Sequence, residues 1–169
     1  MFTDILPEET INEGGLGEFI SVLEKKDITT WPTWTATPTT DAQKATRTGN
    51  FTLASSKYFT KVNIVPDESD AETTADGGAQ MLSAKTVLKF KVSGVDAAKL
   101  GFFKQNKLKS MVFAYTDRSG VQYLIGDETQ GAYITKVKAS VGKNRGFEVE
   151  VTYTGKEPAV WTGTPAYSA

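Results

Sequence analysis

The chain has 169 residues, of which 39% are hydrophobic and 23% are charged, a balance typical of a globular domain with a buried core. Its net charge of −1 argues against general nucleic-acid binding, which requires an excess of basic residues. It contains no cysteine and no histidine, which excludes disulfides, thiolate chemistry, His-ligated metals and Ser-His-Asp catalysis.

Targeting and membrane signals are not found in the sequence. No apolar run approaches the roughly 20 residues of a membrane-spanning helix. The start, MFTD, lacks the basic and apolar regions of a signal peptide. We therefore expect a chain made in the cytoplasm that does not cross a membrane.

The N-terminal part divides into an arm and a first element. Residues 1–15 are acidic and turn-rich, which predicts an extended arm. In residues 16–26, Leu16, Phe19, Ile20 and Leu23 fit one face of an amphipathic helix. The same residues also fit a strand, and periodicity alone does not decide between the two.

Residues 27–49 are dominated by Thr, Pro and Ala, and Pro32 and Pro38 favour an extended connection. Trp31 and Trp34, together with Trp161, could form a platform on which sugars stack. Large aromatic side chains more commonly pin a long loop to the body of a domain, and we favour that interpretation.

Two strands are predicted over residues 58–65 and 85–93, and we expect them to pair as a hairpin. The segment between them, about residues 66–84, is acidic and poor in large apolar residues. It cannot bury enough apolar surface to offset the entropy of ordering, so we expect a long mobile loop. The segment does not fit a calcium-binding EF-hand loop, because counting from Asp67 the sixth position is Glu72 instead of Gly.

A short helix is predicted at about residues 95–105. Asp96 can cap its first turn, and Leu100 and Phe103 provide an apolar stripe. The lysines around it are interpreted as a solvated face in preference to a phosphate site.

The second half of the chain is predicted to be β-structure. Residues 107–126 form a hairpin around the turn at residues 117–120, residues 130–141 and 147–153 form two further strands, and residues 156–169 form an extended tail. Glu148 and Glu150 project from one face of a strand, and paired carboxylates can serve glycoside hydrolysis, with Asp127 as a third candidate. Nothing places a second functional group beside them, so we predict no catalytic residue, no cofactor and no metal site.

These elements describe one mainly β domain over residues 1–169, a β-sandwich or small barrel with one short helix. In four places the chain resembles tailed-bacteriophage virion proteins, most closely tail tube proteins. The four places are the lead-in GGLGEFISVLEKKDITTWP, residues 87–94 with the following helix, the hairpin YTDRSG…YLIG, and the ending PAVWTG. The resemblance favours a strand over residues 18–23.

The resemblance implies a non-enzymatic structural subunit of the virion tail, assembled in the host cytoplasm. Subunits would form rings, commonly hexameric, which stack into a tube. The tube would contact other tail proteins and conduct DNA without sequence-specific binding. The strands expected to line its lumen carry Tyr58, Thr60, Val62, Ile64, Val87, Lys89 and Lys91. The acidic loop, with Asp67, Glu68, Asp70, Glu72 and Asp76, would order against the next ring.

One departure from the family pattern concerns charge. Lumens in this family tend to be acidic, whereas lysines lie on or beside the predicted lumen strands: Lys57, Lys61, Lys85, Lys89 and Lys91. Either these lysines point away from the lumen, or the strand assignment is wrong, or the chain is another virion component. The alternative function is a monomeric carbohydrate-binding sandwich that uses Trp31, Trp34 and Trp161.

Overall fold

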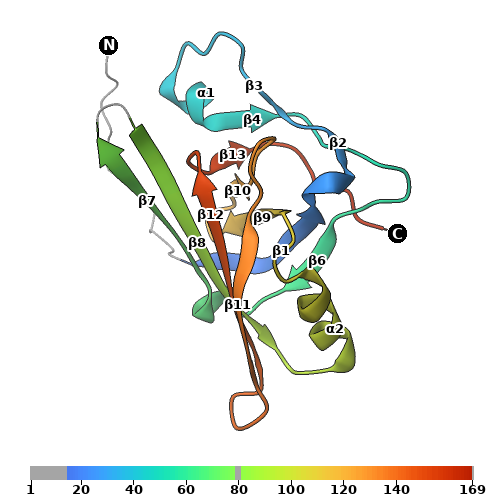
Figure 1. Ribbon diagram of the computed structural model, residues 1–169. Coiled ribbons are helices and arrows are strands. Elements are labelled where there is room, and N and C mark those ends of the chain that lie inside the picture. Colours follow the sequence, from blue (N-terminus) through green and yellow to red (C-terminus); the bar gives the residue numbers. More distant parts are fainter. Residues whose placement is uncertain (1–14, 79–80, 169) are drawn as a thin grey trace.

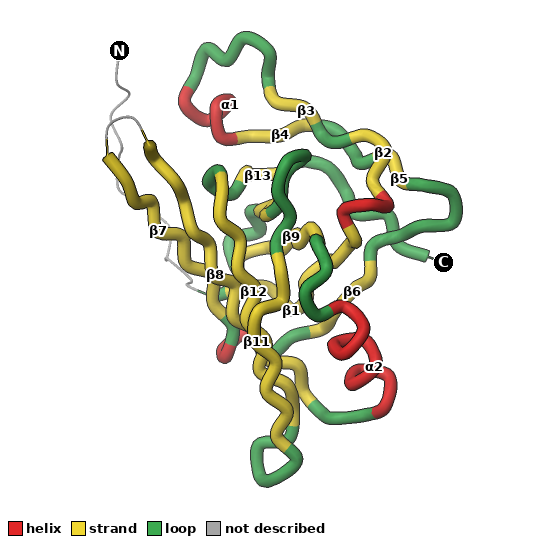
Figure 2. Tube along the Cα trace, in the orientation of Figure 1, coloured by secondary structure: helices red, strands yellow, loops and turns green. Residues whose placement is uncertain are grey.

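The fold is built from two main β-sheets, and the computed structural model describes residues 15–78 and 81–168 (Figure 1). Strands dominate, and the sheets do not close into a barrel in the described part of the chain (Figure 2). The prediction of a mainly β, sandwich-like fold is confirmed. The predicted N-terminal arm lies outside the described residues except for Gly15.

The larger sheet has seven strands. In spatial order they are β3 (Thr33–Trp34), β4 (Thr46–Thr48), β13 (Ala159–Trp161), β10 (Gln122–Ile125), β9 (Met111–Asp117), β1 (Leu16–Glu24) and β6 (Thr60–Asn63). The predicted hairpin is confirmed as β9 and β10. Its turn is closed by Asp117, whose carboxylate accepts hydrogen bonds from the Val121 N–H at 2.9 Å and the Ser119 hydroxyl at 2.6 Å.

The smaller main sheet has four strands, and each neighbouring pair is antiparallel. In spatial order they are β11 (Tyr133–Ser140), β12 (Gly146–Gly155), β8 (Met81–Ser93) and β7 (Asp70–Gly78). β11 and β12 confirm the two strands predicted there. A separate two-stranded sheet pairs β2 (Ile28–Thr30) with β5 (Thr52–Leu53).

The core lies between the two main sheets. Side chains alternate along β8 and β12, so that Leu88, Phe90, Phe147 and Val149 are buried while their sequence neighbours face outward. A second cluster around Trp161 lies on the other face of the seven-stranded sheet and packs against residues of β2 and β5.

The first element is a strand, as the resemblance indicated. β1 lies between β9 and β6, and Ile20, Ser21, Val22 and Leu23 are all buried. Ile20 and Val22 belong to the core between the sheets, whereas Leu23 belongs to the second cluster. A strand that is covered on both faces does not alternate apolar and polar residues. The apolar residues of β1 therefore also fitted the periodicity of a helix.

The prediction of a loop over residues 66–84 is wrong for the described part, residues 66–78 and 81–84. This segment begins with the short 3-10 turn η2 (Pro66–Glu68) and continues as β7, which forms a hairpin with β8. The small residues Thr73 and Ala75 face Thr86 and Ala84, and the hydroxyls of Thr73 and Thr86 are 2.9 Å apart. Backbone pairing with a long neighbouring strand therefore orders a segment that has little apolar surface to bury.

The predicted pairing of residues 58–65 with residues 85–93 is also wrong. β6 pairs with β1 in the larger sheet, and β8 pairs with β7 and β12 in the smaller one. Between the two segments, the Val65 N–H donates to the Lys91 carbonyl at 2.8 Å, and Val62, Ile64 and Val92 belong to the same core cluster.

The helix predicted at about residues 95–105 is confirmed as α2 (Ala97–Asn106), capped by Asp96 through the Lys99 N–H at 2.8 Å. A second, five-residue helix, α1 (Asp41–Ala45), was not predicted; a capping box between Thr40 and Gln43 begins it. A further 3-10 turn, η1 (Lys25–Asp27), follows β1. The predicted extended tail contains the strand β13, which inserts between β4 and β10.

Candidate functional site

The outer face of the four-stranded sheet carries a regular pattern of charge, which we name the charge ladder. It arises because alternate residues of each strand face outward, and strand pairing aligns them in rows across the sheet. One row contains Lys136, Glu150, Lys89 and Asp70, and the next contains Lys138, Glu148 and Lys91. Each strand contributes one sign of charge to the rows, in the order positive, negative, positive, negative.

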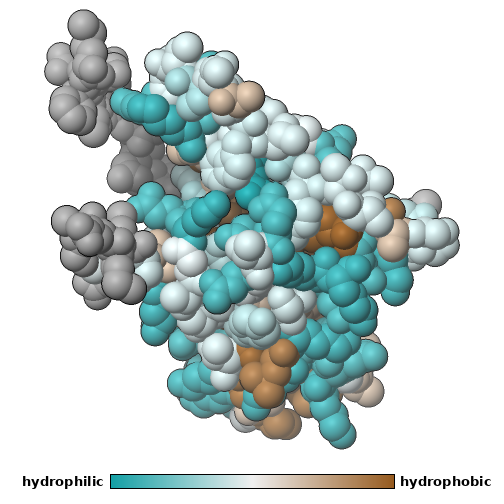
Figure 3. Space-filling model, turned by 45° about the horizontal axis from the view of Figure 1, so that its top comes forward, coloured by the Kyte–Doolittle hydropathy of each residue, from teal (hydrophilic) through white to brown (hydrophobic). Residues whose placement is uncertain are grey.

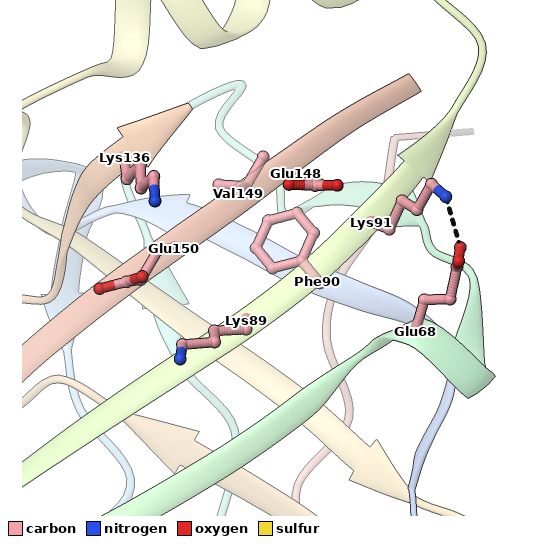
Figure 4. A pocket seen from close by; sticks show the side chains of 8 residues that line it. All are labelled: Glu68, Lys89, Phe90, Lys91, Lys136, Glu148, Val149 and Glu150. Carbon is pink, nitrogen blue, oxygen red and sulfur yellow. Dashed lines mark ion pairs between the residues drawn. The ribbon is translucent and has the colours of Figure 1, made fainter. Parts of the chain in front are cut away.

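Ion pairs hold parts of the ladder together. The Lys91 ammonium lies 2.7 Å from the Glu68 carboxylate of η2, and the Lys138 ammonium lies 3.6 Å from the Glu148 carboxylate. Figure 4 shows the side chains of Lys89, Glu150 and their neighbours across this surface, which is hollowed by about 300 Å³. Because neighbouring strands carry opposite signs, each carboxylate has a lysine beside it, an arrangement suited to ion pairing.

The two edges of this sheet carry opposite charges. β7 is one outermost strand and presents Asp70 and Glu72, while β11 is the other and presents Lys136 and Lys138. All four side chains belong to exposed residues. Among the described residues, neither β7 nor β11 has a strand on its outer side, so both edges can receive another strand.

The structure divides the predicted assembly loop. Asp67 and Glu68 lie in η2, where Asp67 forms an ion pair with Arg118, and Asp70 and Glu72 lie on the β7 edge. The backbone of Asp76 belongs to β7. The acidic residues therefore lie at a sheet edge instead of in a loop.

The structure also divides the predicted lumen residues. Val87, Lys89 and Lys91 share the outer face of β8. Of the four remaining residues, Thr60 and Val62 lie on β6 in the other sheet, and Tyr58 and Ile64 flank that strand. Tyr58 and Thr60 are exposed, whereas Val62 and Ile64 are buried in the core. The predicted lumen surface is therefore not one continuous surface.

Sequence reasoning did not identify the β11 and β12 part of the ladder as a site. The signal was present in the alternation of Lys136 and Lys138 and of Glu148 and Glu150. Because strand pairing was unknown, the two glutamates were considered only as paired carboxylates for catalysis. Their alignment with lysines on both sides depends on the register of β11, β12 and β8.

The structure does not bring the three tryptophans into one exposed platform. Trp161 is 2% exposed, and its indole N–H donates to the Gly49 carbonyl at 2.8 Å. Trp31 packs edge-on against Phe51, with the ring centroids 5.4 Å apart. Trp34 is partly exposed, and the guanidinium of Arg47 lies 4.7 Å from its ring centroid. The interpretation of the tryptophans as anchors fits these contacts.

Asp127 is a buried carboxylate with structural partners. One oxygen accepts hydrogen bonds from the Thr129 N–H at 2.8 Å, the Thr129 hydroxyl at 2.6 Å and the Gln130 N–H at 2.6 Å, and the other accepts from the Tyr153 hydroxyl at 2.8 Å. Burial raises the pKa of Asp127, but the hydrogen bonds outweigh burial and lower the pKa to about 2. Asp127 is thus held in its ionised form, and both of its carboxylate oxygens accept hydrogen bonds within the fold.

Within the described ranges, no group of three or more acidic residues is arranged to hold a metal ion. No helix among the described residues is long and apolar enough to cross a membrane. Figure 3 shows a face on which hydrophobic residues gather in small separate areas among hydrophilic ones.

No protein-family model, curated protein or solved structure matches this chain.

Proposed function

We propose that the chain is a structural subunit of a bacteriophage tail that self-assembles into rings, which stack into a DNA-conducting tube. The tail assignment rests on the resemblance of the four sequence stretches. The observation that carries self-assembly is the opposite charge of the two free edges of the four-stranded sheet.

The direction of the strands supports a continuous sheet between copies. The order β11-β12-β8-β7 contains an even number of strands, and each neighbouring pair is antiparallel. A neighbouring copy in the same orientation therefore presents its β11 antiparallel to β7. The charge alternation continues across this junction, because the acidic β7 edge meets the basic β11 edge.

This junction uses different surfaces on the two partners, so it is a head-to-tail contact. Repeated head-to-tail contacts close into a ring when the rotation between copies allows closure. Closure also pairs every exposed edge of the four-stranded sheet, which would otherwise be a template for aggregation. The charge ladder would then line one face of the ring.

The charge ladder is compatible with passing DNA despite its lysines. Of the five lysines on or beside the predicted lumen strands, Lys85, Lys89 and Lys91 lie on the outer face of β8. Carboxylates of β7 and β12 lie beside this row, so the face has no strong basic excess to bind phosphates. Of the other two lysines, Lys57 pairs with Asp27 at 3.7 Å, and Lys61 lies 4.1 Å from the ring centroid of Phe19, both away from the ladder.

The proposed location is the virion tail, after assembly in the host cytoplasm. The proposed partners are further copies of the chain, other tail proteins and DNA bound without sequence specificity. The alternative of a carbohydrate-binding module is not favoured, because Trp161 is buried and Trp34 is engaged by Arg47.

Reversing the charge of one edge tests the proposal. The double variant Lys136→Glu/Lys138→Glu should fail to assemble at concentrations at which the unchanged chain forms rings or tubes, because acidic edges then repel each other. Mixing it with the variant Asp70→Lys/Glu72→Lys should restore assembly, since the two edges are again complementary. Light scattering over a concentration series, with negative-stain images of the largest species, measures both outcomes.

Lys143→Glu is the matched control, because Lys143 is exposed in the turn between β11 and β12 but lies outside both strands. It should assemble as the unchanged chain does. Uniform rings formed by the Lys136→Glu/Lys138→Glu variant alone would contradict the proposal.

A further inference from the structure

A cavity of about 530 Å³ lies between the two main sheets, beside the β7 edge. It is lined by residues of β7 from the smaller sheet, by residues of β1, β9 and β10 from the larger sheet, and by the connection between β12 and β13. A cavity of this volume is large enough for a small organic ligand.

The charged residues that line the cavity are all acidic: Asp70 of β7, Asp117 of β9, and Glu157 in the connection that precedes β13. None of the three forms an ion pair with another residue in the described part of the chain. Arg118 follows Asp117 in the sequence, but it pairs with Asp67 and does not line the cavity. The negative charge of the cavity is therefore not balanced from within, and it favours a cationic ligand.

A buried hydroxyl in the same cavity also points to a ligand. Tyr115 is 6% exposed, and its ring stacks on that of Tyr123, with the ring centroids 5.5 Å apart. The Tyr123 hydroxyl donates to Asp117 at 3.3 Å, but no described residue forms a hydrogen bond with the Tyr115 hydroxyl. Every fully enclosed side-chain N or O atom in the described ranges has a partner, so the Tyr115 hydroxyl must reach the cavity that Tyr115 lines.

The surroundings of this hydroxyl keep it neutral. Burial raises the pKa of Tyr115, and the neighbouring Tyr123 raises it further. The negative charges of Asp117 and Asp70 act in the same direction, which places both carboxylates near the hydroxyl. A neutral hydroxyl beside two carboxylates can accept an N–H hydrogen bond from an ammonium group that the carboxylates attract.

The arrangement of the carboxylates favours an organic cation over a metal ion. No group of three acidic residues in the described ranges is placed to hold a metal ion, so the three carboxylates do not converge on one point. The walls between them include Ala71, Tyr123 and Pro158, which are all partly buried. A ligand with ammonium groups at its ends and methylene groups between them matches both the separated charges and the apolar walls.

We propose that this cavity binds an aliphatic diamine or polyamine. One ammonium group lies between Asp70 and Asp117 and donates a hydrogen bond to the Tyr115 hydroxyl. The other ammonium group pairs with Glu157, and the methylene groups lie against the partly buried walls. This binding goes beyond the proposed tail function, and a chain that forms no rings would still bind the amine.

Isothermal titration calorimetry with putrescine, a diamine, tests the cavity at protein concentrations below those at which the chain assembles. Butylamine, which has the same carbon chain but one ammonium group, should bind at least about tenfold more weakly, because one carboxylate then stays without a partner. Glu157→Gln should weaken putrescine binding at least about fivefold for the same reason. Glu72→Gln is the matched control, because Glu72 is exposed on β7 but does not line the cavity. It should bind putrescine as the unchanged chain does.

Three results of this titration overturn the proposal. They are absence of putrescine binding up to about 10 mM, equal binding of the two amines, and equal effects of the two glutamate variants.

Tyr115→Phe tests the hydroxyl, since it removes the oxygen and keeps the ring. It should weaken putrescine binding about three- to tenfold, the effect of losing one hydrogen bond. Tyr133→Phe, on β11 and outside the cavity, is the control and should leave binding unchanged. Without amine, Tyr115→Phe should unfold in urea at the same midpoint as the unchanged chain, because the hydroxyl has no hydrogen-bond partner among the described residues. Unchanged affinity, or a loss of affinity accompanied by a lower urea midpoint, overturns the role of the hydroxyl in binding.

Discussion

At the scale of single residues, Asp127 shows how a buried carboxylate can stabilise a fold through its hydrogen bonds. It closes the connection between β10 and β11 and ties that connection to β12 through Tyr153. Asp127 is 6% exposed, so protein donors supply the hydrogen bonds that water would make to an exposed carboxylate. From sequence, Asp127 could be considered only as an acid in a possible active site, because its partners come from the turn and from a distant strand.

The ionised form of Asp127 should stabilise the fold in a pH-dependent way. Its folded pKa of about 2 lies below the value of about 3.9 in an unfolded chain, so the contribution is fully present above about pH 5 and is lost as the pH falls towards 2. Asp127→Asn should lower the free energy of unfolding by about 2–3 kcal/mol at pH 7, and the gap to the unchanged chain should roughly halve at pH 3. Urea denaturation at the two pH values measures this, and a gap that does not depend on pH would contradict it.

At the scale of elements, the two segments that sequence reasoning treated as loop or tail are strands because of their neighbours. β7 pairs along its whole length with β8. β13 has only three residues, yet it pairs antiparallel with β10 and parallel with β4. β7 lacks the composition of an independent strand, and β13 is too short to stand alone, so their pairing partners supply the hydrogen bonds and burial that a short window of sequence does not predict.

Trp161 should be the anchor of β13. It is 2% exposed, packs against Phe51 with ring centroids 5.1 Å apart, and belongs to the second hydrophobic cluster. Trp161→Ala should cost about 3–5 kcal/mol of unfolding free energy, because it leaves a large cavity. Trp34→Ala is the matched control and should cost about 1 kcal/mol, since that ring is partly exposed and mainly loses its contact with Arg47. Equal costs in urea denaturation would show that β13 is not anchored in this way.

At the scale of the whole molecule, the two main sheets end in edges of different character. The four-stranded sheet ends in edges of opposite charge, which suits pairing between neighbours in a ring. The seven-stranded sheet ends at β6, where backbone bonds from Phe59 to Ala166 and from Val65 to Lys91 flank the strand. The proposed contact between the edges of the four-stranded sheet would depend mainly on exposed charges, so salt should affect it.

Salt should weaken the proposed contact between β7 and the β11 of a neighbouring copy. Raising the NaCl concentration from 0.1 to 1 M shortens the Debye length from about 10 Å to about 3 Å. The concentration needed for ring assembly should rise about fivefold, because exposed ion pairs are screened. For Lys136→Glu/Lys138→Glu the same change should favour assembly, since salt then screens repulsion. Light scattering at both salt concentrations measures the two trends, and trends of the same sign would contradict a charge-guided edge.

The sequence by itself determined the elements whose pattern is local. The β9–β10 hairpin was predicted from a turn that needs Asp117 and Gly120, β12 from strict alternation, and α2 from its cap and apolar stripe. Each of these depends on residues close together in the chain, so a short window contains the physical cause.

Only the tertiary structure decided which strands pair and which charges meet. The pairing of β6 with β1, the ordering of β7 by β8, and the insertion of β13 between β4 and β10 all join segments distant in sequence. The charge ladder has the same origin, because Lys136, Glu150, Lys89 and Asp70 form a row only when four strands adopt one register. A strand pattern specifies which side chains share a face, but hydrogen bonding between strands is nearly independent of sequence, so burial across the whole molecule selects the partners.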